Sequence, residues 1–431
     1  MRLLVINIFF DPMSFGGATV VAEQVAAEID RMATHEVTAV SATFEKISGY
    51  RITRYHTRFG FDGFQVSLPN PDSQKPLVRT RNEAFDQALS RILDFVAPDA
   101  VHVHCTQDIG ASFFDELKAR EIPLMVTVHD FWYFCERQFM IDIAGEFCGQ
   151  RAIDIDRCAA CSSNRAETVH RTAYLMGQLA KADLVVTPSD YARDMLVANG
   201  LAPDQVRVNK NGVAAPSSAD GRGRTDWTDG PVRVGFIGGP GAIKGWDLII
   251  EAFRTDPQLT TRVRIIAVDA GANAGHPWKE ELLENADDLP IEIVPGYRPD
   301  TIDAAFARFD AVICPSRWKE TFGLFAREAT IRGKWVIASD AGGLAEDIDD
   351  GVNGRVLAFP PTAASVAGAL KELADRTAPP AFDQRVITTF DHQAKEAMNW
   401  LQELASKRAA AYSGASSVDD ELPQHDRTSA P

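Results

Sequence analysis

Two glutamates with seven residues between them, Glu320 and Glu328, stand in the segment Pro315–Asp347. The segment follows the apolar run Ala311–Cys314, which is typical of a strand, and a helix is expected to begin near Thr321. The first turn of a helix offers unpaired backbone N–H groups and the positive end of the helix dipole, which together suit a phosphate. Glu320 at the start of this helix and Glu328 about two turns further along can each hold a pair of sugar hydroxyls. The alternative is a capping acid followed by a solvated helix glutamate.

A glycine-rich turn supplies the second group of candidate residues. The turn Gly238–Gly245 follows the strand-like run Val232–Ile237 and carries Lys244 near its end. Glycines let the backbone approach a phosphate closely, and a lysine there adds a positive charge. The turn is not a P-loop, because no Lys-Ser or Lys-Thr pair closes it. A phosphate site and a plain strand-to-helix turn both remain open for this segment.

Further candidates follow predicted strands in the first half of the chain. His104 and the pair His129-Asp130 stand at strand ends, where residues of an α/β sheet face a ligand. His129 can donate to a phosphate oxygen or hold a sugar hydroxyl, whereas His104 is interpreted as a structural histidine bonded to a nearby loop. The pair Gly16-Gly17 follows the first strand, where it either brings backbone N–H groups to a ligand or forms a tight turn.

Four cysteines, Cys135, Cys148, Cys158 and Cys161, lie within 27 residues and end in a C-x-x-C pair. Thiolates at this density suit a structural zinc site in a reducing compartment. Such a site would tie down an insert that has little core of its own. An iron–sulfur cluster and free thiols are the alternatives.

The elements that position these residues alternate between strands and helices. The 431 residues, of which 45% are hydrophobic and 24% charged, are typical of a soluble globular chain of two domains. Strand-like runs recur from Leu3–Ile8 to Val206–Asn209, then restart at Val232–Ile237 and continue to Arg355–Leu357. Helical segments lie between them, which predicts mostly parallel sheets. Tyr50–Pro76 shows no clear period and is predicted to be a loop-rich insert.

The predicted fold class is α/β, with two doubly wound Rossmann-like domains that face each other across a cleft. The segment 214–230 is poor in large apolar residues and is typical of a linker. The predicted divisions are an N-terminal domain 1–213 with a cysteine-rich insert 131–164, the linker 214–230, a C-terminal domain 231–378, a helical segment 379–411 and a disordered tail 412–431.

Charge and hydropathy exclude several classes of protein. A net charge of −16 argues against a nucleic-acid binder, which needs a basic face. No apolar run reaches the roughly 18–20 residues of a membrane span. The start Met1–Asn7 is typical of a strand and lacks the cleavage site of a signal peptide. We therefore expect a cytoplasmic protein, and peripheral contact at the inner membrane face is left open.

Taken together, these residues resemble the retaining glycosyltransferases of family 4, which have the GT-B architecture. The resemblance extends from Phe15 to Gly354 and is most specific in the block Pro315–Gly354. The run His129–Trp132 with the downstream cysteines is similar to a bacterial subset that builds surface polysaccharide or cell-wall glycan. The motifs that carry the resemblance are Pro315-Ser316, Glu320-Thr321-Phe322-Gly323-Leu324, Glu328, Gly342-Gly343, Glu346, Gly351–Gly354, Lys244-Gly245, Val103-His104, Thr127–Asp130, Pro188-Ser189 and Asn211–Val213.

The resemblance implies a role for each matched residue. Glu328 would hold the ribose hydroxyls of a nucleotide-sugar donor, and Glu320 would lie beside the donor sugar as a positioning group. Lys244 would contact the diphosphate, and His129 the transferring sugar and its β-phosphate. Such enzymes need no divalent metal ion. Residues expected near the sugar, the phosphates or the acceptor side are Thr321, the backbone amides of Phe322, Gly323 and Leu324, and the pair Gly16-Gly17.

One position departs from the family pattern. Many relatives carry an arginine where this chain has Gly239, and that arginine also grips the diphosphate. Lys244, Arg317, Arg327 or another base is expected to take its place.

The predicted function is that of a retaining hexosyltransferase-type glycosyltransferase. It would move a sugar from a nucleotide-diphosphate sugar to a glycan or a lipid-linked acceptor, in bacterial polysaccharide or cell-surface glycan synthesis. A nucleotide-sugar epimerase of GT-B fold and a non-catalytic nucleotide-sugar-binding protein are the alternatives.

Overall fold

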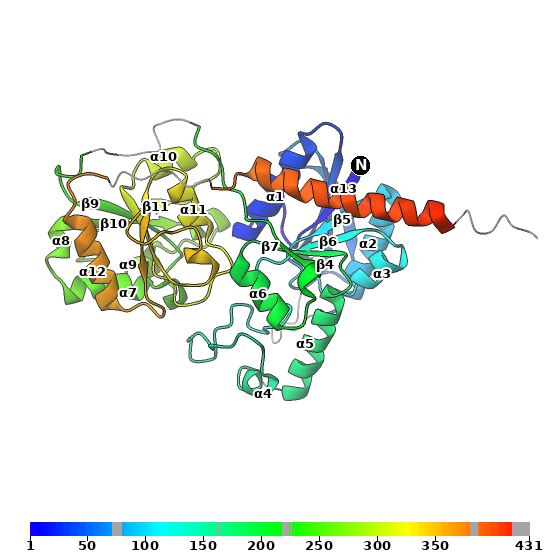
Figure 1. Ribbon diagram of the computed structural model, residues 1–431, viewed down its shortest axis with the longest axis horizontal. Helices are drawn as coiled ribbons and strands as arrows, with labels where there is room; N and C mark the ends of the chain where they lie inside the picture. Colours follow the sequence, from blue (N-terminus) through cyan, green and yellow to red (C-terminus); the bar gives the residue numbers. More distant parts are fainter. Residues whose placement is uncertain (71–79, 163, 218–223, 225, 380–386, 416–431) are drawn as a thin grey trace, which may run out of the picture.

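The structure, a computed structural model, describes residues 1–70, 80–162, 164–217, 224, 226–379 and 387–415. Figure 1 shows two α/β units, the first coloured blue to green and the second green to orange. Each unit is built on its own sheet. The predicted fold class of two Rossmann-like domains is therefore confirmed.

The first domain contains an eight-stranded sheet in the order β3-β4-β2-β1-β5-β6-β7-β8. Its strands are parallel except β3, which runs antiparallel to β4 at the edge. The carboxyl ends of β1 and β5 form a topological switch point, because the strand order reverses there. The strands are β1 (Arg2–Ile6), β2 (Glu36–Glu45), β3 (Arg51–His56), β4 (Asp62–Pro69), β5 (Ala100–Val103), β6 (Leu124–Thr127), β7 (Leu184–Thr187) and β8 (Val206–Val208).

Helices cover both faces of this sheet. Successive residues of β1 point to opposite faces, so Leu4 and Ile6 pack with α2 while Leu3 and Val5 pack with α1. The helices of this domain are α1 (Gly17–Asp30), α2 (Glu83–Val96), α3 (Phe114–Ala119), α4 (Ile155–Cys158), α5 (Arg165–Leu179) and α6 (Asp190–Ala198).

The prediction of a loop-rich insert over Tyr50–Pro76 is wrong. β3 and β4 form an antiparallel pair there, and β4 joins the sheet beside β2. The alternate residues Phe64, Val66 and Leu68 of β4 are buried with α2. Only these three residues carry the alternation, and an alternating run this short does not stand out from a loop. Residues 71–79, which include the end of the predicted insert, lie outside the described residues.

The second domain contains a six-stranded parallel sheet in the order β11-β10-β9-β12-β13-β14. This order places the switch point between β9 and β12. The strands are β9 (Val232–Ile237), β10 (Val263–Asp269), β11 (Ile291–Pro295), β12 (Ala311–Cys314), β13 (Trp335–Ser339) and β14 (Gly354–Leu357), and the helices are α7 (Trp246–Thr255), α8 (Leu259–Arg262), α9 (Lys279–Leu283), α10 (Ile302–Phe306), α11 (Leu324–Thr330) and α12 (Ala363–Ala374).

Helix α11 begins at Leu324, whereas the sequence predicts its start near Thr321. Gly323 has a φ of 92°, in the left-handed region, so the chain becomes helical only after this glycine. The segment before Gly323 is instead held by a backbone bridge from Glu320 to the loop after β13. The two glutamates of the motif therefore lie on different elements, Glu320 in a loop and Glu328 within the helix.

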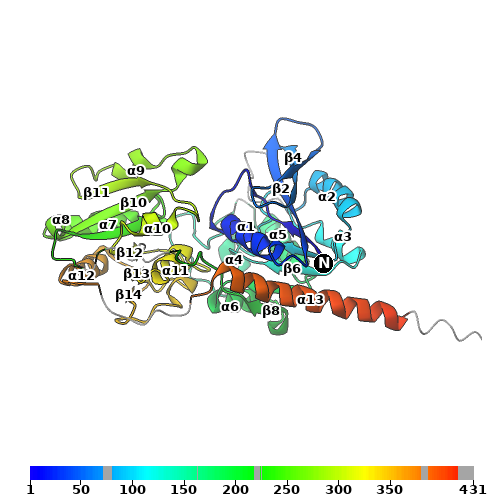
Figure 2. The ribbon, with the colours of Figure 1, turned by 90° about the horizontal axis from the view of Figure 1, so that it is seen from above.

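The last helix, α13 (Phe390–Ala415), returns to the first domain. Figure 2 shows this helix lying along α1, and Met398 and Leu401 share a core with Val25 of α1. From Phe390 on, the predicted C-terminal helical segment 379–411 thus covers the first domain, and its residues 380–386 lie outside the described residues. α13 also extends four residues into the predicted tail 412–431, whose remainder lies outside the described residues. Within the described residues, no helix is both long enough and apolar enough to cross a bilayer.

The end of the predicted linker 214–230 belongs to the second domain. Trp227 is buried in the core of that domain, and its backbone N–H donates to the Thr377 carbonyl at 2.9 Å. Residues 218–223 and 225 of the predicted linker lie outside the described residues.

Candidate active site

The loops at the switch point of the second domain bring Lys244 and Glu320 together. Lys244 ends a 3₁₀ turn after β9, and Glu320 lies in the loop after β12. The Lys244 Nζ donates to Glu320 Oε1 at 2.9 Å and lies 5.1 Å from the centre of the Trp318 ring. The side chains are 30% and 11% exposed, respectively. The cation predicted for a phosphate and the carboxylate predicted for a sugar thus form one charged pair at the strand ends.

Close backbone contact holds these two loops against each other. Gly245 has a φ of 76°, and a Cβ atom there would lie 2.1 Å from the Pro315 carbonyl oxygen. The Arg317 N–H donates to the Ile243 carbonyl at 2.8 Å. Only glycine permits this approach, so the glycine after Lys244 is required by the packing of the two loops.

The two arginines considered as substitutes for a base at Gly239 are engaged elsewhere. Arg327 is buried. It donates to carbonyl oxygens of the loop after β13, and its Nε donates to Asp347 at 2.8 Å. Arg317 pairs with Asp247 at 2.7 Å. These contacts give both arginines structural partners and leave Lys244 as the cation that pairs with Glu320.

Backbone donors lie on the same loop as Glu320, in the turn before α11. The N–H groups of Phe322, Gly323 and Leu324 have no hydrogen-bond acceptor within the described part of the chain. The buried Phe322 ring lies under the Arg327 guanidinium, 4.3 Å from its centre, which fixes the turn. Adjacent unpaired amides of this kind can bind an anion.

Glu328 is held by Tyr297, through a contact that the sequence does not predict. The Tyr297 hydroxyl, just after β11, donates to Glu328 Oε2 at 2.6 Å. Burial raises the pKa of Glu328, and the hydrogen bond from Tyr297 opposes this rise. Burial is the main cause that raises the pKa of Tyr297 well above its usual value, and the adjacent Glu328 carboxylate raises it further. The Tyr297 hydroxyl therefore stays protonated and remains a donor. Tyr297 thereby orients the carboxylate and occupies one of its two oxygens.

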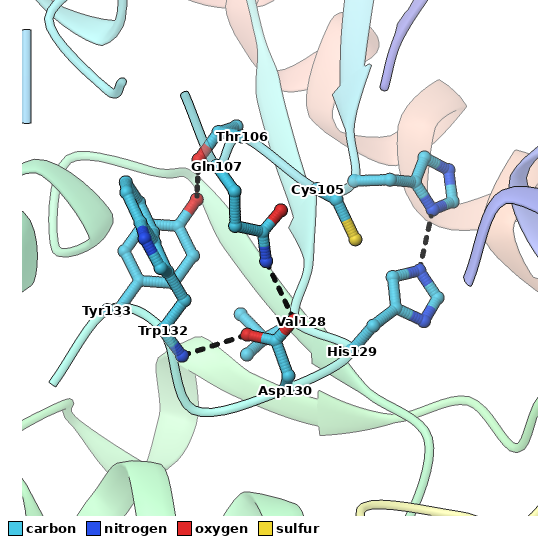
Figure 3. Close-up of a pocket in the computed structure, with 9 residues that line it drawn as sticks. Cys105, Thr106, Gln107, Val128, His129, Asp130, Trp132 and Tyr133 are labelled. Carbon is cyan, nitrogen blue, oxygen red and sulfur yellow. Dashed lines mark hydrogen bonds between the residues drawn. The ribbon is translucent and has the colours of Figure 1, made fainter. Parts of the chain in front are cut away.

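His104 and His129 follow the neighbouring parallel strands β5 and β6 and meet at the strand ends. His104 Nδ1 and His129 Nε2 are 2.9 Å apart, and Figure 3 shows the hydrogen bond. The partner of His104 is thus the other candidate histidine. Burial lowers the pKa of His129 to about 4. Burial, with the nearby His102 and His129, lowers the pKa of His104 well below its usual value, so both rings are neutral at pH 7.

Asp130 fixes the turn that carries His129. Its buried carboxylate accepts from the Trp132 N–H at 2.8 Å and from the side-chain amides of Gln107 and Gln138, each at 2.7 Å. Asp130, Trp132 and Gln107 line a small pocket beside His129 (Figure 3). The role of Asp130 is therefore structural, and it acts on His129 through the backbone.

Gly16 and Gly17 stand at the start of α1, at the switch point of the first domain. Gly16 has a φ of 81°, which favours glycine, although a Cβ atom there would meet nothing within 4 Å. A Cβ atom on Gly17 would lie 3.0 Å from Leu324 Cδ1, in the other domain. This loop therefore borders the second domain beside the turn that carries the free amides.

Hydrogen bonds join the two domains around this site. Thr321 Oγ1 donates to the His129 carbonyl at 2.6 Å. Glu346 accepts from a backbone N–H at the start of α6 at 2.8 Å. The structure thus gathers Lys244, Glu320 and the free amides on one side and His129 on the other.

The four cysteines lie within the insert 131–164, whose Phe139 ring lies 4.8 Å from the Trp318 ring, centre to centre. All four are free and part-buried. Within the described residues, no three His, Cys, Asp or Glu side chains are grouped as a metal ion would require. A metal at Cys135, Cys148, Cys158 and Cys161 stays a prediction.

Sequence reasoning placed the segment Val294–Tyr297 near the donor but did not predict the contact of Tyr297 with Glu328, and it did not single out Trp318. Neither belongs to a recognisable motif, and both act on a motif residue, Glu328 and Lys244 respectively. Both lie just after a strand, so the rule that ligand sites form at the carboxyl ends of strands is the signal that could have found them.

Comparison with known proteins finds a family match in each domain. Residues 15–215 match the family described as Glycosyltransferase Family 4, and residues 222–385 match Glycosyl transferases group 1. The first match covers most of the first domain, and the second covers the second domain.

Three individual proteins illustrate the similarity. A D-inositol 3-phosphate glycosyltransferase of Nocardia farcinica is 29% identical over 52% of each chain. An uncharacterized 42.6 kDa protein in the cps region of Klebsiella pneumoniae is 23% identical over 80% of this chain and 87% of that one. The chain spans about half the length of the D-inositol 3-phosphate glycosyltransferases that it matches. Anabaena Alr3699/HepE, solved in complex with UDP and glucose, is 15% identical, with a TM-score of 0.57 and coverage of 96% of this chain and 100% of that one, which shows a shared fold.

Proposed function

We propose that this chain, a glycosyltransferase of the GT-B type by its fold and by the families that match its two domains, transfers a sugar from a nucleotide-diphosphate sugar to an acceptor hydroxyl. The observation that carries the proposal is the Lys244–Glu320 pair at the switch point of the second domain. It lies on the loop whose Thr321 bonds to His129 of the first domain. A donor bound there has one domain on each side.

Lys244 and the backbone amides before α11 suit the diphosphate of such a donor. The bond between the anomeric carbon and a phosphate oxygen breaks during transfer, and negative charge develops on the leaving diphosphate. A lysine and fixed N–H donors stabilise this charge without reorganisation. Lys244 then lies between the diphosphate and Glu320, which keeps the lysine in place.

The two glutamates divide the rest of the donor between them. Glu320 faces Lys244 and holds the sugar next to the diphosphate, whereas Glu328 holds the ribose hydroxyls with the oxygen that Tyr297 leaves available. We assign His129 to the transferring sugar, because its carbonyl is bonded to the loop of Glu320.

We further infer that transfer retains the anomeric configuration and that the acceptor is a glycan or a lipid-linked glycan of a surface polysaccharide. Retention rests on the resemblance of the motif from Glu320 to Glu328 to the retaining enzymes of family 4. The polysaccharide role is supported by the similarity to the Klebsiella pneumoniae protein, whose name places it in a cps region.

A donor screen followed by product analysis tests this proposal. UDP-, GDP-, ADP- and dTDP-sugars are compared in a thermal-shift assay, and the donor with the largest shift is incubated with and without candidate acceptors. We expect an acceptor-dependent product that keeps the anomeric configuration of the donor, read by proton NMR. Conversion of the donor alone into an isomeric nucleotide sugar would indicate an epimerase. Tight binding without turnover over a broad acceptor panel would indicate a binding protein.

A further inference from the structure

The hydrogen bond between His104 and His129 contains one proton that either ring can carry. Both rings are neutral, so each has one N–H and one lone pair. Either His104 Nδ1 donates to His129 Nε2, or the reverse holds. The two arrangements leave opposite groups on the second nitrogen of His129, an N–H in the first case and a lone pair in the second.

Burial on the far side of His104 decides between these arrangements. His104 is 2% exposed, and its Nε2 has no hydrogen-bond partner in the part of the chain that the structure describes. A proton on that atom would be a buried N–H without an acceptor, which folded proteins rarely contain, whereas an unpaired buried acceptor is tolerated more often. The ring of His102 packs against the ring of His104, with 4.1 Å between ring centres; its Nε2 is engaged with Thr127, and its buried Nδ1 forms no hydrogen bond with His104 or with any other described residue. The proton of His104 therefore belongs on Nδ1.

We propose that His104 is a positioning residue that donates from Nδ1 to His129 and thereby fixes His129 as a hydrogen-bond donor through its own Nδ1. Figure 3 shows the second ring nitrogen of His129 turned away from the hydrogen bond. His129 is only half-buried, and this nitrogen is not among the buried atoms that lack a partner. Thr321 holds the carbonyl of the same residue from the second domain, so the N–H is presented at the domain boundary.

The arrangement gives His129 a defined chemistry. Proton uptake at its Nε2 would force the His104 proton onto a buried nitrogen without an acceptor, so His129 is a poor base. As a neutral donor it suits a sugar hydroxyl or a phosphate oxygen. The identity of that oxygen rests on the proposed function, whereas the tautomer does not.

The tautomer is measured directly, on the full chain without any ligand. Histidine labelled with ¹⁵N gives ring nitrogen shifts that separate protonated from unprotonated nitrogen, and the chain has nine histidines. The His129 signals are assigned by their absence from His129→Asn. We expect a protonated Nδ1 and an unprotonated Nε2 at His129. A protonated Nε2 in the wild-type chain would overturn the proposal.

Two substitutions at His104 then separate donation from packing. The side-chain amide of His104→Asn can stand where Nδ1–H stands, whereas His104→Leu supplies no donor. We expect His104→Asn to keep the tautomer and to hold kcat for sugar transfer within about threefold, and His104→Leu to lower kcat about 10- to 100-fold with a smaller change in KM. An equal loss in both variants would reduce His104 to a packing residue and overturn the proposal. If the chain turns over no donor at all, the proposed function fails. The ¹⁵N measurement of the His129 tautomer in the wild-type chain then still confirms or overturns the role of His104.

Discussion

Tyr297→Phe removes one hydroxyl from the structure and tests how Glu328 is held. The hydroxyl donates to Glu328 Oε2 at 2.6 Å, and burial already raises the pKa of that carboxyl. A hydrogen bond to a charged group contributes about 1.5–3 kcal/mol. We expect the free energy of unfolding of the second domain to fall by about this amount at pH 7, because the substitution leaves a partly buried carboxylate with one donor fewer.

The destabilisation depends on pH in a direction that the pKa shift of Glu328 sets. The lost bond is one to the ionised form, so the pKa of Glu328 rises further in the variant. The full difference between wild type and variant is present above that pKa. It shrinks as the pH falls from 7 toward the usual carboxyl range near 4.5, where Glu328 is protonated in both proteins. Urea unfolding of wild type and Tyr297→Phe at several pH values measures this difference in the free energy of unfolding.

Nucleotide binding distinguishes an orienting role of Tyr297 from a merely structural one. If Glu328 binds ribose hydroxyls, Tyr297→Phe should raise the Kd of the preferred nucleoside diphosphate about tenfold, because the carboxylate loses its fixed orientation. The size of the effect is taken from residues that orient metal ligands, whose loss weakens metal binding by a similar factor. Isothermal titration calorimetry measures this change. The half-buried Tyr50 of the first domain provides a matched control, Tyr50→Phe, which should leave Kd unchanged. An unchanged Kd in Tyr297→Phe, with the stability loss intact, would refute the reasoning.

Lys244→Ala should lower kcat/KM for donor turnover about 10²- to 10³-fold while the melting temperature changes little, and Lys407→Ala, which breaks an exposed Lys–Glu pair on α13, should alter neither. Wild-type turnover in the first variant would contradict the phosphate assignment. Gly245→Ala should destabilise the second domain by more than about 2 kcal/mol in urea unfolding, because its Cβ would strike a carbonyl oxygen of the loop after β12. Gly241→Ala is the control, since nothing lies within 4 Å of its Cβ position and its φ is −66°. Burial lowers the pKa of His102 to about 3, so its contribution to stability is present above about pH 6.5 and is lost as the pH falls toward 3. His102→Leu should therefore show a shallower loss of stability between those values, by up to about 1.4 kcal/mol per pH unit; an unchanged slope would mean that His102 does not titrate on unfolding.

Strongly apolar runs predict the fold of this chain well, and short alternating ones do not. Ala311–Cys314 is a continuous apolar run and Val232–Ile237 is interrupted by only one charged residue, Arg233, because parallel strands are buried on both faces; both predictions match the observed strands. β3 and β4 lie at the edge of the first sheet, where one strand is largely exposed and the other carries only three buried alternate residues. Their pattern is not distinguishable from a polar loop in the sequence.

Strand order explains why the Lys244–Glu320 contact could be anticipated only in part. The rule that ligands bind at the carboxyl ends of strands places both residues at one edge of the sheet. Their contact follows from β9 and β12 being neighbours, although β10 and β11 separate them in the sequence. That adjacency is a property of the sheet order, and a motif does not contain it. The same holds for Tyr297, which reaches Glu328 from the other side of the switch point.

Thr321 shows that a motif residue can also join the two domains. The resemblance places it near sugar or phosphate, which stays a prediction, and its hydroxyl donates to the His129 carbonyl across the domain boundary. Glu346, from the same block of the motif, likewise accepts from a backbone N–H of the first domain. Both side chains satisfy backbone groups of the opposite domain, so any separation of the domains removes these bonds and moves His129 away from Glu320. The motif would then contain two kinds of residue, those that bind the donor and those that set the distance between the two domains at the site. This explains why the motif extends over a loop, a turn and a helix.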